Sequence, residues 1–137
     1  MIALREISRE ERLKVKSILE KENIKDNLSR GIIYILIDDN IIIGVGKVTP
    51  EHDYGILEYI VVDPKHRGLN LGDALLRSLL FKAESMGLKK IFYYSENDYL
   101  FKKGFMYNKE KYTNFYKMFL DIQDFFNKGC CGDEDEV

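Results

Sequence analysis

One stretch of the chain has residue types and spacing suited to binding an anion. It reads Val61-Val62-Asp63-Pro64-Lys65-His66-Arg67-Gly68-Leu69-Asn70-Leu71-Gly72-Asp73-Ala74-Leu75, an apolar run that passes through a turn into an amphipathic segment. If a helix begins there, its first N–H groups lack intrahelical partners, and the helix dipole places about half a positive charge at that end. Gly68 and Gly72 expose the backbone, Asn70 tolerates a left-handed conformation, and Arg67 adds a positive charge. This stretch therefore predicts a phosphate site.

Two common phosphate-binding motifs do not fit this stretch. A P-loop requires G-x-x-x-x-G-K-[ST], but Gly72 is followed by Asp73 and Ala74. A dinucleotide-binding fingerprint requires G-x-G-x-x-G, which is also missing from the turn. A glycine-containing turn by itself is often only a connector between a strand and a helix, so the rest of the chain must support a binding role.

The segment Val62 to Leu76 resembles the signature of the GNAT superfamily of N-acetyltransferases, V-x-P-x-x-R-G-x-G-x-G followed by x-A-L-L. Asn70 stands where that family usually has its middle glycine. The resemblance implies a loop that binds the pyrophosphate of coenzyme A, with acetyl-CoA as the cosubstrate. It also implies a bulged strand whose backbone binds the pantetheine arm. The cofactor-binding residues implied in this way are Ile60, Val61, Val62, Arg67, Gly68, Leu69, Asn70, Leu71, Gly72, Asp73 and Asn97.

Direct acetyl transfer to an amine needs a base, because an amine is protonated at neutral pH. Glu58 is the candidate, as the only carboxylic acid within the apolar run from Ile56 to Val62, and it matches a glutamate frequent in this family. The alternatives are a glutamate that faces water at a strand edge, or a carboxylate that positions the substrate. The resemblance also implies that a backbone N–H of the same strand faces the thioester carbonyl, where such a donor typically lowers the barrier by about 2.7 to 4 kcal/mol.

A general acid for the departing thiolate is suggested by a second family pattern, L-Y-x-K-x-G-F. The matching stretch here is Tyr99-Leu100-Phe101-Lys102-Lys103-Gly104-Phe105. Counted back from Gly104-Phe105, the family tyrosine falls on Leu100, and Tyr99 lies one residue early. One residue turns a helical side chain by about 100°. Tyr99 is therefore predicted either as the acid or as a packing or substrate-contacting residue.

The elements that must position these residues follow from hydrophobic periodicity and turn signals. Ser8 and Glu11 form a capping box that opens a helix over about residues 9 to 22, and residues 25 to 30 form a loop or a short helix. Further helices are predicted over about 71–86 and 97–103, and strands over 32–37, 41–48, 54–62, 90–94, 105–107 and 115–122. The fold class is α+β, and the resemblance, over about residues 2 to 122, implies a central mixed, mostly antiparallel sheet of six to seven strands flanked by helices. A splayed parallel pair is expected at the cofactor site.

Composition limits the class of protein. A chain of 137 residues with 45% hydrophobic content fits one domain, placed at residues 1–128, followed by a flexible acidic tail at 129–137 that contains Cys130 and Cys131. These cysteines are either thiols of a flexible tail or a pair that is redox-sensitive or adjacent to the active site. They have no metal-ligand spacing with His52 or His66, and His66 is predicted to face solvent or lie near the phosphate.

A net charge of −2 gives no support to nucleic-acid binding, and no apolar run is long enough to cross a membrane. No secretory signal is evident, so a cytoplasmic location is predicted. The sequence thus predicts an acetyl-CoA-dependent N-acetyltransferase that acts on a primary amine of a small-molecule or peptide acceptor, as a monomer or homodimer. The alternatives are a module that senses coenzyme A without efficient turnover, motivated by Leu100, and a protein-interaction domain that uses the acidic tail.

Overall fold

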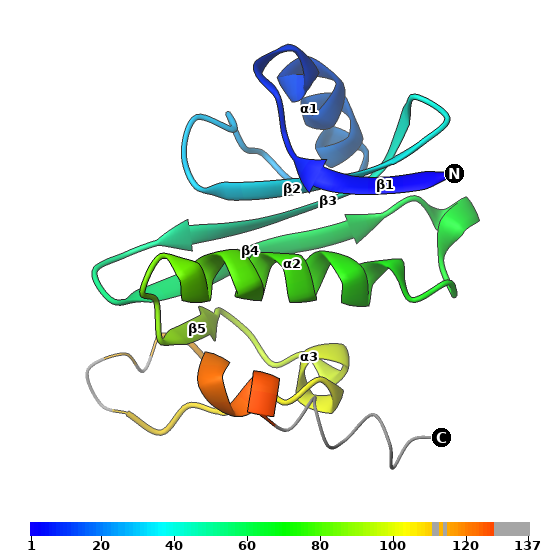
Figure 1. Cartoon of the computed structure of the whole chain (residues 1–137). Coiled ribbons are helices and arrows are strands. Elements are labelled where there is room, and N and C mark those ends of the chain that lie inside the picture. Colours follow the sequence, from blue (N-terminus) through cyan, green and yellow to red (C-terminus); the bar gives the residue numbers. More distant parts are fainter. Residues whose placement is uncertain (111–112, 114, 128–137) are drawn as a thin grey trace. The chain divides into compact units, whose positions relative to one another are not determined.

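The computed structural model describes residues 1–110, 113 and 115–127 (Figure 1). The predicted tail, with Cys130 and Cys131, lies outside the described residues. The first half of the chain forms β1 (Ile2–Glu6), the 3-10 turn η1 (Arg9–Glu11), α1 (Arg12–Lys21), β2 (Ile32–Asp38), β3 (Ile41–Pro50) and β4 (Tyr54–Val62). It continues with the 3-10 turn η2 (Pro64–His66), α2 (Leu71–Ser85), β5 (Lys90–Tyr93), α3 (Asp98–Lys102), β6 (Met106–Tyr107) and β7 (Met118–Asp121), and residues 122–127 are helical.

The strands of the described residues join in one sheet in the order β1-β2-β3-β4-β5-β7-β6. The pairs β1/β2, β2/β3, β5/β7 and β6/β7 are antiparallel, and β4/β5 is parallel. The parallel register covers Tyr54 to Ile56 of β4, which pair with Lys90 to Phe92 of β5. The predicted class, a mixed and mostly antiparallel sheet flanked by helices, is therefore confirmed.

The chain divides into two compact units, and β4 contributes to both. The first unit comprises Met1–Thr49 and Glu58–Lys82. Its sheet has a helix on each face, and Figure 1 shows α1 and α2 on opposite sides of β2 and β3. On the α1 face, Val15 and Leu19 pack with alternate strand residues such as Ile33, Ile35 and Val45. This alternation follows from the two-residue period of a strand, which sends neighbouring side chains to opposite faces.

The α2 face of the first unit has its own apolar cluster. Leu71 and Leu75 of α2 pack there with Leu36, Ile43 and Ile60. A side chain at Gly46 would come within 2.9 Å of the Leu79 side chain, so this glycine lets the helix approach the sheet closely. The helix that follows the predicted phosphate loop is thus fixed to the strands beneath it.

The second unit comprises Pro50–Leu57 and the described residues from Ala83 onwards. Its core includes an aromatic cluster in which Ile56, Phe92 and Tyr116 are buried and Tyr54 and Phe119 pack against them. The rings of Phe92 and Tyr116 are stacked with centroids 5.3 Å apart, and Tyr54 meets Phe92 edge-on at 5.2 Å. Offset and edge-to-face ring contacts of this kind stabilise a core beyond the area that they bury.

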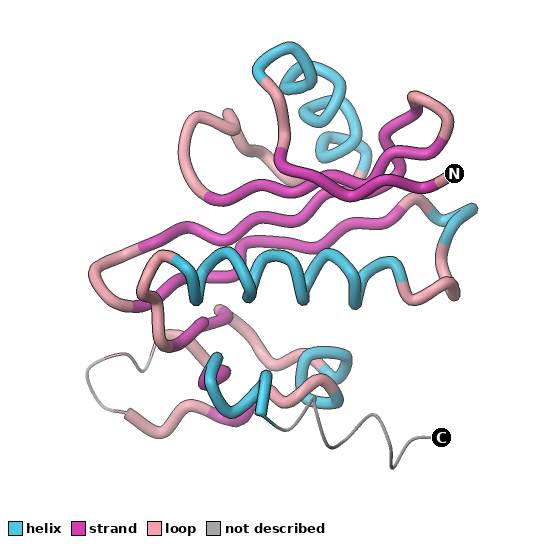
Figure 2. Tube along the Cα trace, viewed as in Figure 1, coloured by secondary structure: helices cyan, strands magenta, loops and turns pink. Residues whose placement is uncertain are grey.

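Most element predictions are confirmed within the usual uncertainty of one or two residues at each end. The capping box is confirmed, because the Glu11 carboxylate accepts hydrogen bonds from the backbone N–H and the hydroxyl of Ser8, both at 2.8 Å. The first turn of that helix is 3-10 rather than α. Residues 25 to 30 form a loop, drawn in pink between α1 and β2 in Figure 2.

One strand was missed and one strand prediction needs correction. Strand β1 was not predicted. It is short and largely exposed, so neither of its faces requires apolar residues and its sequence shows little alternation. The strand predicted over 115–122 begins only at Met118. The residues before it form a turn, in which the Tyr116 N–H bonds to the Thr113 carbonyl and the Asn108 side chain bonds to the carbonyls of both.

Candidate functional site

The predicted phosphate loop connects β4 to α2 in the first unit. After the turn η2, the backbone is extended at Arg67, left-handed at Gly68 (φ +87°) and left-handed again at Asn70 (φ +58°). Asn70 thus adopts the conformation that a middle glycine would adopt most easily, and asparagine is among the residues that tolerate it best. The predicted left-handed backbone at Asn70 is confirmed, and its contact with a cofactor stays a prediction.

The loop leaves its backbone accessible at the start of α2. Residues 67 to 70 are exposed, and a side chain added at Gly68 would meet nothing within 4 Å. The Ala74 N–H bonds to the Asn70 carbonyl, which begins the hydrogen-bond ladder of the helix. The N–H groups of Leu71 and Gly72 come before this first bond of the ladder. They lie in the first turn of the helix, and the helix dipole makes that end favourable for negative charge. The geometry has the features of an anion-binding helix terminus.

Two basic side chains of the loop are held by neighbours. Arg67 folds back on the strand end, where its Nε donates to the Val62 carbonyl at 3.0 Å, and its guanidinium pairs with Glu22 at 3.0 Å. His66 lies between two carboxylates, with Nδ1 3.1 Å from Asp63 and Nε2 3.6 Å from Asp38. His66 thus links the loop to the end of β2, and the expectation that it faces solvent or lies near a phosphate stays a prediction.

The residues Ile60, Val61 and Val62 are packed through their side chains. Val61 is buried on the α1 face, and Ile60 and Val62 pack on the α2 face. The contact of their backbone with a pantetheine arm stays a prediction.

Strand β4 carries one residue more than the segment of β3 opposite it. The Asp63 N–H bonds to the Ile43 carbonyl at one end, and the Glu51 N–H bonds to the Tyr54 carbonyl at the other, both at 2.8 Å. Between these bonds β3 advances eight residues while β4 advances nine. An extra residue on one strand is the defining property of a β-bulge, and bulges often occur next to active sites, where they redirect side chains.

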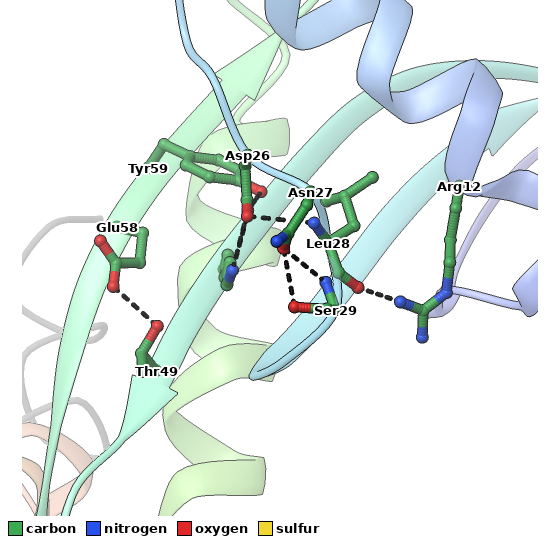
Figure 3. Close-up of polar contacts among 9 residues, drawn as sticks. Arg12, Asp26, Asn27, Leu28, Ser29, Thr49, Glu58 and Tyr59 are labelled. Atoms are coloured by element: carbon green, nitrogen blue, oxygen red, sulfur yellow. Dashed lines mark hydrogen bonds and ion pairs between the residues drawn. The ribbon is translucent and has the colours of Figure 1, made fainter.

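The side chains of Glu58 and Tyr59 locate this irregularity (Figure 3). Lys47 and Thr49 are two residues apart on β3 and so share a face. Glu58 accepts a hydrogen bond from the Thr49 hydroxyl at 2.6 Å, and Tyr59 shares a carboxylate partner with Lys47. Adjacent residues of a regular strand point to opposite faces, yet here both reach partners on one face. The extra residue therefore lies at or beside Glu58.

Asp26 is the centre of a buried polar network beside this position. Its carboxylate accepts hydrogen bonds from the Lys47 ammonium at 2.8 and 3.0 Å and from the Tyr59 hydroxyl at 2.7 Å (Figure 3). Burial opposes the charge of Asp26, but the hydrogen bonds from Lys47, Tyr59 and the Leu28 N–H outweigh it and keep the Asp26 pKa below its ordinary value. Burial, together with the Asp26 carboxylate, raises the pKa of Tyr59. Tyr59 is therefore a hydrogen-bond donor at any physiological pH.

The network fixes the loop between α1 and β2. Leu28 is buried in the α1-face core with a left-handed backbone (φ +60°), its N–H bonds to Asp26 at 3.1 Å, and its carbonyl accepts a hydrogen bond from Arg12. A bulky residue rarely adopts such a conformation unless its surroundings impose it. Asp26 bonds both to the Leu28 N–H and to Tyr59 of β4, so this loop is anchored to the strand that carries Glu58.

Sequence reasoning did not identify Asp26, Lys47, Tyr59 or Thr49. One signal was available, since Lys47 interrupts an otherwise apolar run from Ile41 to Val48. A lysine in such a position is almost never buried without a partner. Its partner, however, lies 21 residues earlier in a loop, and no local pattern connects the two.

Asn97 and Tyr99, the remaining predicted site residues, belong to the second unit. The Asn97 side chain caps α3 by accepting a hydrogen bond from the Leu100 N–H at 2.9 Å. Tyr99 is 39% exposed, with the Lys103 ammonium 5.6 Å from the centre of its ring. Leu100, where the family pattern has its tyrosine, is 3% exposed and belongs to the core. The structure thus gives Asn97 a structural contact and leaves both predicted roles as predictions.

A sequence model described as the acetyltransferase (GNAT) family matches residues 1–106, more than three quarters of the chain. The chain belongs to the GNAT acetyltransferase family. This confirms the resemblance drawn from the loop signature. A search of curated proteins found no match to the chain.

Solved structures of GNAT acetyltransferases share the fold at low sequence identity. A GNAT-family acetyltransferase from Staphylococcus aureus Mu50 is 17% identical with a TM-score of 0.71, over 89% of this chain and 99% of that one. The ribosomal-protein-S18-alanine N-acetyltransferase of Escherichia coli is 18% identical with a TM-score of 0.66, over 89% and 94%. N-acetylglutamate synthase from Neisseria gonorrhoeae, crystallised with coenzyme A and N-acetyl-glutamate, is 18% identical with a TM-score of 0.67 over 89% of this chain. The chain corresponds to 35% of that synthase.

Two kinds of feature are missing from residues 1–110, 113 and 115–127. No helix among them is long and apolar enough to cross a membrane. The same residues contain no group of three or more histidine, cysteine, aspartate or glutamate side chains arranged to hold a metal ion.

Proposed function

We propose that this GNAT protein is an acetyl-CoA-dependent N-acetyltransferase that transfers the acetyl group directly to a primary amine of a small-molecule or peptide acceptor. The observation that carries the proposal is the loop from Arg67 to Leu71, whose exposed, left-handed backbone opens onto the first turn of α2.

The loop fits a diphosphate in shape and in charge. The space beside Gly68 admits an oxygen where a side chain would obstruct it, and the helix terminus supplies N–H donors with a favourable dipole. Arg67 is half exposed and already paired with Glu22, so the backbone is the main anion-binding group. When bound, acetyl-CoA supplies an activated acetyl group as a thioester.

Glu58 is the proposed base that takes the proton of the attacking amine. It is partly buried and lies on the strand that leads to the loop. A positioned base of this type typically contributes about 10²- to 10⁴-fold to the rate. Backbone N–H groups of Ile60 to Val62 are the proposed donors to the thioester oxygen, because the side chains of these residues are occupied in packing.

The proposed acid is Tyr99, which is exposed enough to meet a ligand. A thiolate is a moderate leaving group, since a free thiol ionises with a pKa of about 8.5, so acid assistance helps without being essential. The acetyl group then moves from sulfur to nitrogen, with the amine proton on Glu58.

A second candidate function is a module that senses coenzyme A with little turnover. The observation that favours it is the burial of Leu100 in the core of the second unit, where a hydroxyl group would be expected in an active member of the family. The two functions share the loop and differ in whether chemistry follows binding.

The deciding experiment measures binding and turnover separately. Isothermal titration with acetyl-CoA tests the loop, and thiol release with a panel of primary amines tests the chemistry. We expect binding together with sustained, amine-dependent release of coenzyme A. Binding without release from any amine supports the sensor, and no binding at millimolar cofactor removes both candidates.

The base is tested with Glu58→Gln, for which we expect a fall in kcat of about 10²-fold with little change in cofactor affinity. Glu20→Gln is the matched control, because Glu20 is an exposed carboxylate on α1 of the same unit. Equal activity of the two variants would exclude Glu58 as the base.

A further inference from the structure

Thr49 makes a contact that the proposed chemistry does not yet use. Its hydroxyl lies 2.6 Å from Oε2 of Glu58, and both side chains are partly buried. An ionised carboxylate can only accept hydrogen bonds, so the threonine hydroxyl is the donor. Hydrogen bonds from a hydroxyl to a carboxylate at this distance belong to the strong, charge-assisted class.

This contact exists because of the extra residue in β4. In a regular strand, Glu58 and Tyr59 would point to opposite faces, and only one of them could share the face of Lys47 and Thr49. The irregularity at Glu58 turns its side chain to the face on which Thr49 lies (Figure 3). The hydroxyl then fixes a flexible side chain that its own strand does not hold in a regular orientation.

The backbone on either side of the contact is held firmly. Lys47, two residues before Thr49, and Tyr59, next to Glu58, both bond to the Asp26 carboxylate. One buried carboxylate therefore bridges β3 and β4 within two residues of the Thr49–Glu58 pair. Catalytic groups need support of this kind, because a misplacement of about 1 Å can cost on the order of 10² in rate.

We propose that Thr49 is a positioning residue that holds the Glu58 carboxylate in the orientation from which it accepts the amine proton. This inference rests on the proposed function, since it needs Glu58 to act as the base. It assigns to Thr49 no contact with acetyl-CoA.

The test is a double-mutant cycle between the two residues, measured with the best amine from the panel. Thr49→Val keeps the shape of the side chain and removes the donor, and we expect kcat to fall about tenfold with the KM for acetyl-CoA unchanged. Thr49→Ser restores the hydroxyl, and its kcat should lie within about twofold of wild type. The Thr49→Val/Glu58→Gln double variant should be no slower than Glu58→Gln alone, because Thr49 acts through Glu58.

The control for removal of a hydroxyl is Tyr34→Phe, on the α2 face of β2 in the same unit. Its kcat should match wild type, and melting temperatures of all variants show whether any loss reflects unfolding. Wild-type kcat for Thr49→Val, failure of serine to restore the rate, or additive losses in the double variant would each overturn the role of Thr49 and leave the proposed function intact. A wild type that turns over no amine would instead overturn the proposed function, and the role of Thr49 with it.

Discussion

The ion pair between Asp26 and Lys47 should be a main determinant of stability in the first unit. The perturbation is Asp26→Asn, which keeps the shape of the side chain and an acceptor for the Leu28 N–H but removes the negative charge. Lys47, with only 8% of its side chain exposed, then loses the negative charge of its carboxylate partner. The substitution therefore tests the charge rather than the packing.

The magnitude follows from burial. Removing one partner of a buried ion pair typically costs about 3 to 5 kcal/mol, because the remaining charge stays desolvated. Asp26 keeps 13% of its side chain exposed, so water lowers this cost, and we expect about 2 to 3 kcal/mol. With an unfolding entropy of about 2.1 cal/mol/K per residue, a chain of 137 residues has about 0.29 kcal/mol/K. The melting temperature should therefore fall by about 7 to 10 °C.

The pH dependence gives a second readout with a defined sign. The pKa of Asp26 is lowered in the folded protein from an ordinary value of 3.8, so its charged form stabilises the fold above that pH. The difference between wild type and Asp26→Asn should be complete at neutral pH. It should shrink as the pH falls below about 3.8, because a protonated aspartate resembles asparagine in charge.

The assay is thermal unfolding followed by circular dichroism at pH 7 and at several acidic values. Glu110→Gln is the matched control, since Glu110 makes an exposed ion pair with Lys90 in the second unit and such pairs contribute little. A loss in Asp26→Asn no greater than that in the control would refute the reasoning. The double variant Asp26→Asn/Lys47→Met removes both charges and should regain part of the lost stability. If it regains none, the reasoning is also refuted.

Three further predictions concern the loop, a helix cap and the second unit. Gly68→Val should abolish detectable binding of coenzyme A in isothermal titration, because φ +87° is strained for valine. Asn70→Gly should bind like wild type, and equal loss in both variants would show that the loop is not the binding site. The pKa of Glu11 is lowered to about 2, mainly by its hydrogen bond from Arg5. Glu11→Gln should therefore lower the melting temperature at pH 7, and the two melting temperatures should converge as the pH falls from 4.5 towards 2. A difference in melting temperature that persists undiminished at pH 2 would contradict this. Leu100→Tyr should destabilise the fold by about 1 to 3 kcal/mol through overpacking without raising kcat, and a faster variant would show that the family tyrosine can be restored there.

Much of the fold could be predicted because local patterns determine its elements. The β-branched runs of β2 and β3 and the apolar run of β4 predicted strands. The Ser8 and Glu11 capping box predicted a helix start, and Glu11 accepts two hydrogen bonds there. The left-handed residues of the loop were also predictable, because only glycine and a few polar residues adopt that conformation at low cost. Strand β1 was missed because an exposed edge strand has no buried face to impose a pattern.

The sequence by itself determined the family, and it predicted the anion-binding loop and the choice of Glu58, because each depends on residues that are neighbours in the chain. Only the tertiary structure decided what surrounds Glu58. The contacts Thr49–Glu58, Asp26–Lys47 and Asp26–Tyr59 join residues 9, 21 and 33 positions apart. The first depends on where in β4 the extra residue lies, which no local pattern marks. Such contacts arise from strand register and burial, which are properties of the folded chain as a whole.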